Sequence, residues 1–174
     1  MLNTQLIEHY GYERAKASVL ESMRKLQVDY LDLCLLHQPF SDAYGAYRAL
    51  EELYDEGKIR AIGISNFYTD RMVDFASFNR IKPMVNQVEI HPHNQQTEAK
   101  AWHDKYGIQM EAWAPFGEGR GDMFHTPELK VMRSTESLLL KSFFVGICSV
   151  ELSSFQNPLT SSVWKKTFMY LIFL

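Results

Sequence analysis

Apolar residues follow two alternating patterns along most of this chain. Over residues 11–27 they recur every three or four positions, which forms the single apolar stripe of an amphipathic helix. Residues 28–36 form instead a short, mostly apolar run, which is typical of a strand buried on both faces. The two patterns predict a helix followed by a buried strand.

The same alternation then repeats as far as residue 113. We expect further helices over residues 41–57, 69–78 and 95–106, and further strands over residues 59–65, 84–90 and 108–113. Because strands and helices alternate with short connections, the strands should form a parallel sheet with right-handed crossovers.

Two α/β architectures fit this alternation, an open doubly wound sheet and a (β/α)8 barrel. Polar or aromatic residues stand at or just after the ends of the expected strands, where a TIM barrel places its chemistry. These residues are His37, Ser65, Asn66, Glu89, His91 and Trp113. A dinucleotide-binding doubly wound domain would carry G-x-G-x-x-G after its first strand, and the sequence does not. We therefore expect an incomplete (β/α)8 TIM barrel of about four βα units.

The character of the chain changes near residue 131. The last part, residues 131–174, contains only Glu136 and Glu151 as acidic residues and is rich in Ser, Phe and Leu. Neither the helical nor the strand period is sustained in it. We interpret residues 1–130 as the partial barrel and residues 131–174 as an irregular, non-homologous tail, produced by a frameshift or a mis-assigned exon. The coding DNA would test this hypothesis.

Composition narrows the class of protein. The chain has 174 residues, 46% of them hydrophobic, and a formal net charge of −3. That size fits a single domain, and the mild acidity gives no reason to expect a nucleic-acid partner. The two cysteines, Cys34 and Cys148, are far apart, which favours a reducing, cytoplasmic setting. The sequence has no apolar run long enough to cross a membrane.

His37 is the first candidate for chemistry, because the apolar run in the segment DYLDLCLLHQP ends on it, before Gln38 and Pro39. It can be core filler, a metal ligand or part of an active site, and a lone histidine near a strand end is more often structural. A metal ligand needs partners, and the nearest cluster is His91-Pro92-His93. No Cys or carboxylate stands beside it at a zinc-site spacing. We expect no metal site.

Three other positions have both a structural and a functional interpretation. Ser65-Asn66 can cap the next helix or present hydrogen-bonding groups at the mouth of a barrel. Gln87 stands inside an otherwise apolar strand, so its amide needs a partner, and a ligand amide is one. Trp113 can belong to the core or stack on a planar ring.

Residues 11–129 resemble the aldo-keto reductases, especially their bacterial diketogluconate-reductase-like branch. The resemblance rests on four segments in the family's order and spacing: DYLDLCLLHQP, ALEELYDEGKIRAIGISNF, VNQVEIHP and EAWAPFGEG. They correspond to strands four to seven of an eight-stranded barrel. The activity implied is NADPH-dependent reduction of a small aldehyde or ketone, by hydride transfer from the nicotinamide to the carbonyl carbon.

The resemblance also implies a role for each matching residue. His37 falls on the family's catalytic histidine, which orients and polarises the carbonyl. Ser65, Asn66 and Gln87 fall on positions that hold the nicotinamide carboxamide. Trp113 replaces the aromatic residue, commonly Tyr, that stacks on the nicotinamide ring. The loop after it, which approaches the pyrophosphate in the family, comprises Ala114, Pro115, Phe116 and Gly117.

The sequence departs from the family pattern at both ends of the matching part. The family's catalytic Asp, Tyr and Lys have no counterparts here, and Tyr10 and Tyr12 stand at the start of a helix instead. The Lys-Ser and Arg cluster that holds the adenosine 2′-phosphate also has no match, since Lys141-Ser142 lies in an unrelated context. The alternative is therefore a catalytically inactive fragment that retains at most nucleotide or protein binding.

Four strands cannot close a barrel. We expect unpaired sheet edges at the strands that begin at Val28 and Ile108. Such edges predict self-association.

Overall fold

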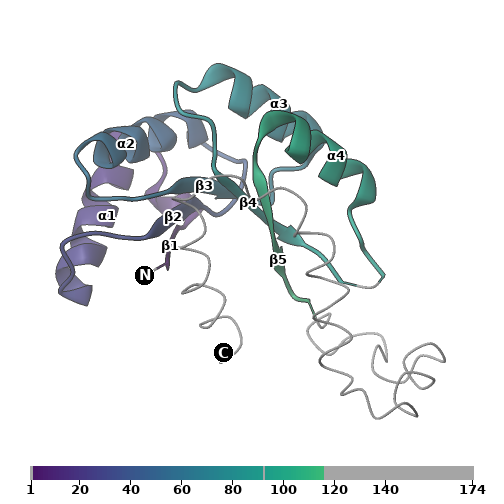
Figure 1. Cartoon of the computed structure of the whole chain (residues 1–174). Helices are drawn as coiled ribbons and strands as arrows, with labels where there is room; N and C mark the ends of the chain where they lie inside the picture. The colour runs from purple at the N-terminus through teal and green to yellow at the C-terminus, as the bar shows by residue number, and fades with distance from the viewer. Residues whose placement is uncertain (1, 92, 116–174) are drawn as a thin grey trace, which may run out of the picture.

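The computed structural model describes residues 2–91 and 93–115 and contains one parallel sheet with helices packed on one of its faces (Figure 1). The strands are β1 (Leu2–Gln5), β2 (Leu33–Leu36), β3 (Ile62–Ser65), β4 (Val85–Glu89) and β5 (Gln109–Trp113). The helices are η1 (Ile7–His9), α1 (Tyr12–Leu26), α2 (Ala43–Asp55), α3 (Thr69–Phe78) and α4 (Thr97–Tyr106). The strands lie side by side in sequence order.

This arrangement confirms the predicted fold class, an α/β partial barrel with a parallel sheet. The four expected α-helices are present, each within a few residues of its predicted bounds. The observed strands are shorter than the expected apolar runs. Ahead of β2 and β3, Leu31 and Ile59 form an isolated parallel bridge that continues the pairing of the two runs. The expected tail, residues 131–174, lies outside the described residues.

One expectation about the sheet edges was wrong. Residues 2–5 form strand β1, which pairs in parallel with β2, so β2 is an interior strand. Apolar periodicity does not indicate β1, because Leu2–Gln5 has a single strongly apolar residue. Among the described residues the outermost strands are β1 and β5. Self-association through these edges stays a prediction.

The two faces of the sheet carry different side chains. Cys34, Ile62 and Ile64 are fully buried and join the core formed with the helices. Leu33, Leu35 and Val85 point to the opposite side and form a separate small cluster. We call this second side the inner face of the sheet. Because side chains alternate along a strand, the residues that alternate with the helix-side core also belong to the inner face.

Local signals explain where the helices begin and end. Asp42 caps α2, because its side chain accepts a hydrogen bond of 2.8 Å from Gly45 N. Gln27 follows α1 and Gly107 follows α4, and both have the left-handed conformation that stops a helix. These caps therefore determine where α2 begins and where α1 and α4 end before the chain returns to the sheet.

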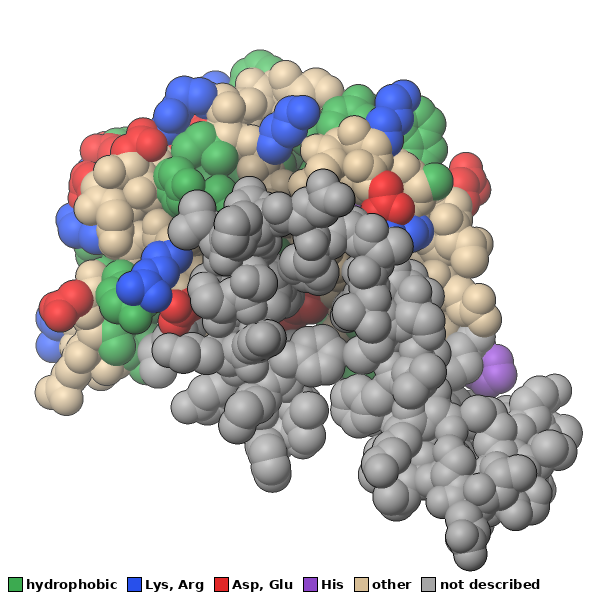
Figure 2. All heavy atoms as spheres, in the orientation of Figure 1, with side chains coloured by type: hydrophobic (Ala, Val, Ile, Leu, Met, Phe, Trp, Pro, Cys, Tyr) green, Lys and Arg blue, Asp and Glu red, His purple; other side chains and the backbone are tan. Residues whose placement is uncertain are grey.

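On the face shown in Figure 2, the described residues show no grouping of one charge. On the described part visible in Figure 2, Lys and Arg side chains lie among acidic, apolar and other side chains. None of the described helices is long and apolar enough to cross a membrane.

A buried polar link joins β4 to α4 on the helix side. His103 is 1% exposed, and Asn86 is fully buried. His103 Nδ1 lies 2.7 Å from the carbonyl oxygen of Ala99, which can only accept, so Nδ1 carries the ring hydrogen. Nε2 then accepts from Asn86 Nδ2 at 2.8 Å, and Nδ2 also donates to Phe67 O at 2.6 Å. The neutral imidazole is the form that satisfies these partners.

Tyr10 holds the chain just after β2. Its ring is fully buried, and its hydroxyl donates to Gln38 O at 2.8 Å and accepts from Gln38 N at 2.9 Å. Burial raises the pKa of Tyr10 to about 12, so the hydroxyl keeps its proton near neutral pH. One side chain thus fixes both backbone groups of the residue that follows His37.

Acidification should destabilise the fold through His103. Desolvation lowers the pKa of His103 below its ordinary value in the folded state. Its stabilising contribution is therefore complete above the unfolded pKa of about 6.5 and is lost as the pH falls below it, by up to about 1.4 kcal/mol per pH unit. Urea unfolding at pH 7, 6 and 5 should show a decline that His103→Gln reduces. The exposed His93→Gln serves as the control, and an equal decline in both variants would contradict the assignment.

Tyr10→Phe should lower the free energy of unfolding by about 1–3 kcal/mol, because it leaves both backbone groups of Gln38 without their buried partner. Tyr12→Phe is the matched control, since Tyr12 is 37% exposed and its hydroxyl bonds the exposed Glu52. We expect a change of about 0.5 kcal/mol or less for the control. Urea titrations of both variants test this, and equal losses of stability would count against the role of the Tyr10–Gln38 hydrogen bonds.

Candidate functional site

Parallel register brings the predicted site residues together on the inner face. Ser65 of β3 lies opposite Gln87 of β4, and Gln87 lies opposite Glu111 of β5. Trp113 follows Glu111 by two positions and so belongs to the same face. Because the strands are parallel, their carboxyl ends meet at one edge of the sheet, and these residues form a row along it.

Asn66 joins the ends of four strands. Its backbone N–H donates to Gln87 O of β4 at 2.9 Å. Its side-chain Nδ2 donates to His37 O, just after β2, at 3.1 Å. Its Oδ1 accepts from the indole Nε1 of Trp113 on β5 at 2.8 Å. Asn66 itself follows β3 and has a φ of 60°, a left-handed conformation that Asn adopts more readily than most residues.

Ser65 adds two hydrogen bonds to those of Asn66. It is 1% exposed, and its hydroxyl donates to Gln87 O at 3.0 Å and accepts from Asn66 Nδ2 at 3.2 Å. The hydroxyl and amide predicted to meet a ligand therefore also brace the strand ends. Their role toward a nicotinamide stays a prediction.

His37 and Trp113 stand at the two sides of Asn66. Both are partly exposed, and Asn66 binds the backbone of His37 and the indole of Trp113. A partly exposed indole held by its N–H offers a fixed flat surface for stacking. The imidazole of His37 lies at the same edge, directly after the strand.

Gln87 is the second amide of the site, and it faces a carboxyl that sequence reasoning missed. Gln87 Nε2 donates to Glu111 Oε1 at 2.6 Å. Glu111 is 4% exposed, and among the described residues its Oε2 has no hydrogen-bonding partner. Burial raises the pKa of Glu111, and the hydrogen bond from Gln87 opposes that rise. The available signal was an acidic residue in the interior of an expected strand.

Of the four predicted residues in the loop after β5, the structure describes two. Ala114 and Pro115 continue from β5, and Ala114 has a φ of 49°, so the chain turns sharply there. Phe116 and Gly117 lie outside the described residues.

His91 and His93 form the histidine cluster weighed as a metal site. His91 Nε2 lies 3.5 Å from Glu89 Oε1, and His91 Nδ1 accepts from His93 N at 3.2 Å. No group of three or more potential metal ligands occurs among the described residues.

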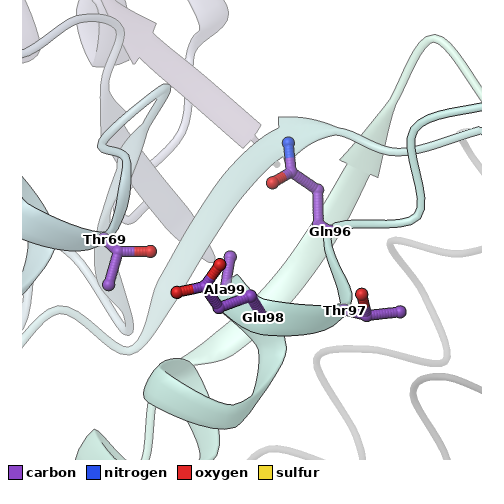
Figure 3. Close-up of a pocket in the computed structure, with 5 residues that line it drawn as sticks. All are labelled: Thr69, Gln96, Thr97, Glu98 and Ala99. Atoms are coloured by element: carbon purple, nitrogen blue, oxygen red, sulfur yellow. The ribbon is translucent and has the colours of Figure 1, made fainter.

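A shallow pocket of about 330 Å³ lies beside the first turns of α3 and α4 (Figure 3). Its lining residues are Thr69, Gln96, Thr97, Glu98 and Ala99. None of the inner-face residues described above lines it. The carboxylate of Glu98 among the lining residues makes the pocket a poor place for an anion. The candidate site is therefore the strand-end row and not this pocket.

Known proteins share both the sequence and the fold. Residues 2–163 match the family model described as Aldo/keto reductase family. Glyoxal reductase of Bacillus subtilis (strain 168) is 48% identical over 114 residues, which is 65% of this chain and 41% of that protein. Methylglyoxal reductase DkgA of Escherichia coli (strain K12) is 36% identical over 125 residues, 70% of this chain and 44% of that protein. The chain thus spans less than half the length of these relatives.

Solved structures also resemble this chain in fold. An aldo-keto reductase, MGS-M4, from a Medee basin deep-sea metagenome library has a TM-score of 0.76 and 32% identity, over 82% of this chain and 54% of that one. A variant of Gox0644 solved with NADPH has a TM-score of 0.73 and 29% identity, over 78% of this chain and 51% of that one. With the family match covering most of the sequence, the chain belongs to the aldo/keto reductase family.

Proposed function

We propose that this chain carries the nicotinamide-facing part of an NADPH-dependent carbonyl reductase that acts on small aldehydes or ketones. The proposal rests on the hydrogen bonds that Asn66 makes with Gln87, His37 and Trp113. They place an imidazole, a fixed indole and a row of amide and hydroxyl groups at one edge of a parallel sheet. Relatives named glyoxal reductase and methylglyoxal reductase support small carbonyl compounds as the substrate class.

The residues present suit a nicotinamide. A carboxamide needs donors and acceptors, and among the described residues Gln87 Oε1 accepts no hydrogen bond, while its Nε2 is held by Glu111. A planar ring needs a flat apolar surface, which the partly exposed Trp113 offers. The NADPH-bound Gox0644 variant shows that an aldo-keto reductase of similar fold binds this cofactor. When bound, NADPH supplies the hydride.

Each residue has a distinct part in the proposal. His37 donates a hydrogen bond to the carbonyl oxygen of the substrate and stabilises the negative charge that develops on it. Trp113 fixes one face of the nicotinamide ring, and Ser65, Asn66 and Gln87 hold its carboxamide. Ala114, Pro115, Phe116 and Gly117 approach the pyrophosphate through their backbone. We place this activity in the cytoplasm, because two distant cysteines suit a reducing setting.

A second candidate is nucleotide binding without turnover. Reduction of a carbonyl needs a proton donor, and Tyr10 is the buried tyrosine beside this end of the sheet. Its hydroxyl is already engaged by both backbone groups of Gln38. Tyr10 is therefore a structural residue, and this observation favours binding alone for the described part of the chain.

Turnover separates the two candidates. The purified chain, mixed with NADPH and glyoxal, methylglyoxal or simple aldehydes, should consume NADPH, as measured by the nicotinamide absorbance. His37→Ala should lower that rate about 100-fold or more, since positioned acid–base groups contribute at least this much. His93→Ala, on an exposed histidine, should keep the rate. Absence of turnover in the unmodified chain would reject the reductase.

Binding is measured separately by tryptophan fluorescence. NADPH should quench the emission, and Trp113→Phe should remove most of the quenching, although the sequence contains three tryptophans. Trp102→Phe is the matched control, because Trp102 lies on α4 and packs against the helix-side core. Quenching that survives in Trp113→Phe and disappears in Trp102→Phe would refute the stacking role. Quenching without turnover would establish the second candidate.

A further inference from the structure

A buried carboxyl on the inner face has no part in the proposed function so far. Glu111 lies opposite Gln87 in the parallel register, and it is 4% exposed. Burying a carboxyl costs free energy unless partners compensate for the loss of water. Here one oxygen, Oε1, has a partner in Gln87, and the other, Oε2, has none in the part of the chain that the structure describes. Packing alone gives no reason for this residue type.

The contact with Glu111 determines which way the Gln87 amide faces. The two ends of a side-chain amide have nearly the same shape, but one accepts hydrogen bonds and the other donates them. A carboxylate only accepts, so it selects the NH2 end of Gln87. The 2.6 Å contact joins Gln87 Nε2 to Glu111 Oε1 accordingly. The acceptor Oε1 of Gln87 is thereby turned away from Glu111.

The other neighbours of Gln87 do not supply this orientation. Its backbone oxygen accepts from Ser65 Oγ and from Asn66 N, which fixes the strand but leaves the side-chain amide free to rotate. Glu111 is the side chain opposite it on β5, at the matching register position. Asn66, the other amide of the row, is held at both ends by His37 and Trp113.

We propose that Glu111 is a positioning residue that presents the Gln87 amide oxygen to the N–H of the nicotinamide carboxamide. This inference rests on the proposed function. The oriented Gln87 would also make the site selective between cofactors. A cofactor with a carboxamide donates its N–H to Gln87 Oε1, whereas a cofactor with a methyl ketone in that place has no N–H to donate.

The test compares two cofactors in the full chain. NADP⁺ and its 3-acetylpyridine analogue differ in that carboxamide, and tryptophan quenching measures the dissociation constant of each. The unmodified chain should bind NADP⁺ about five-fold more tightly, the worth of one hydrogen bond. Gln87→Met should bring the ratio near one, because it removes the acceptor. Glu111→Leu should do the same, and Glu111→Gln, which accepts and donates equally well, should give an intermediate ratio.

Glu51→Gln is the matched control. Glu51 is also a buried acid, 6% exposed, and it accepts a hydrogen bond from Ile81 N at 2.6 Å, far from the inner face. It should keep the ratio of the unmodified chain. A ratio in Glu111→Leu equal to that of the unmodified chain overturns the proposal, and so does a ratio near one in the unmodified chain.

A measurement without nucleotide distinguishes this proposal from the proposed function. The side-chain NH2 of Gln87, assigned by its loss in Gln87→Met, should exchange slowly with solvent in amide NMR spectra. It should exchange at least ten-fold faster in Glu111→Leu, while urea unfolding shows that the variant remains folded. If the chain binds neither nucleotide but shows this difference, the proposed function fails and the positioning role of Glu111 stands. Equal exchange in both proteins overturns the positioning role.

Discussion

The candidate site depends on the hydrogen bonds of Asn66. Four strands end near this residue, and its backbone and side chain reach a partner on or just after three of them besides its own. Each bond contributes a modest net free energy, about 0.5–1.5 kcal/mol. Their effect on geometry is larger, because they determine where the backbone of His37 and the indole of Trp113 lie. The left-handed φ of 60° points the side chain back across the sheet, and few other residues accept that conformation without strain.

Much of this fold was predictable because it follows from periodicity. The apolar stripes of α1 to α4 and the buried runs of β2 to β5 each repeat at the spacing of their element. β1 was missed because Leu2–Gln5 is mostly polar and gains its place by pairing with β2. Gly63 was also beyond sequence reasoning. A Cβ there would lie 2.6 Å from Val85 O and 2.7 Å from Leu35 Cδ2, so the close approach of the strands requires glycine.

Strand ends and a family resemblance were enough to predict that His37, Ser65, Asn66, Gln87 and Trp113 lie near one edge of the sheet, and their roles toward a cofactor stay predictions. The contacts between these residues were not predictable. Neither the strand ends nor the resemblance indicates that the indole of Trp113 bonds Asn66 Oδ1, because that contact spans 47 positions in the sequence. Glu111 was missed for a related reason. An acidic residue within a strand looks like a solvent-facing position until the register places it against Gln87 in the interior.

Buried polar atoms without partners occur on both faces of the sheet, so such an atom does not identify a ligand site by itself. Within residues 2–91 and 93–115, Asn86 Oδ1 lacks a partner on the helix side, as does Tyr47 OH in the core. These atoms are enclosed by side chains of the helices, and His103 and Phe67 engage both hydrogens of the Asn86 amide. Glu111 differs because it lies on the inner face, beside Gln87 and near the strand ends at Ser65 and Trp113, where no described helix packs. A costly carboxyl is retained there beside an amide that it orients. This combination of face, neighbour and unused acceptor supports the proposed role of the buried carboxyl in binding, and it distinguishes Glu111 from the polar groups that only support the core.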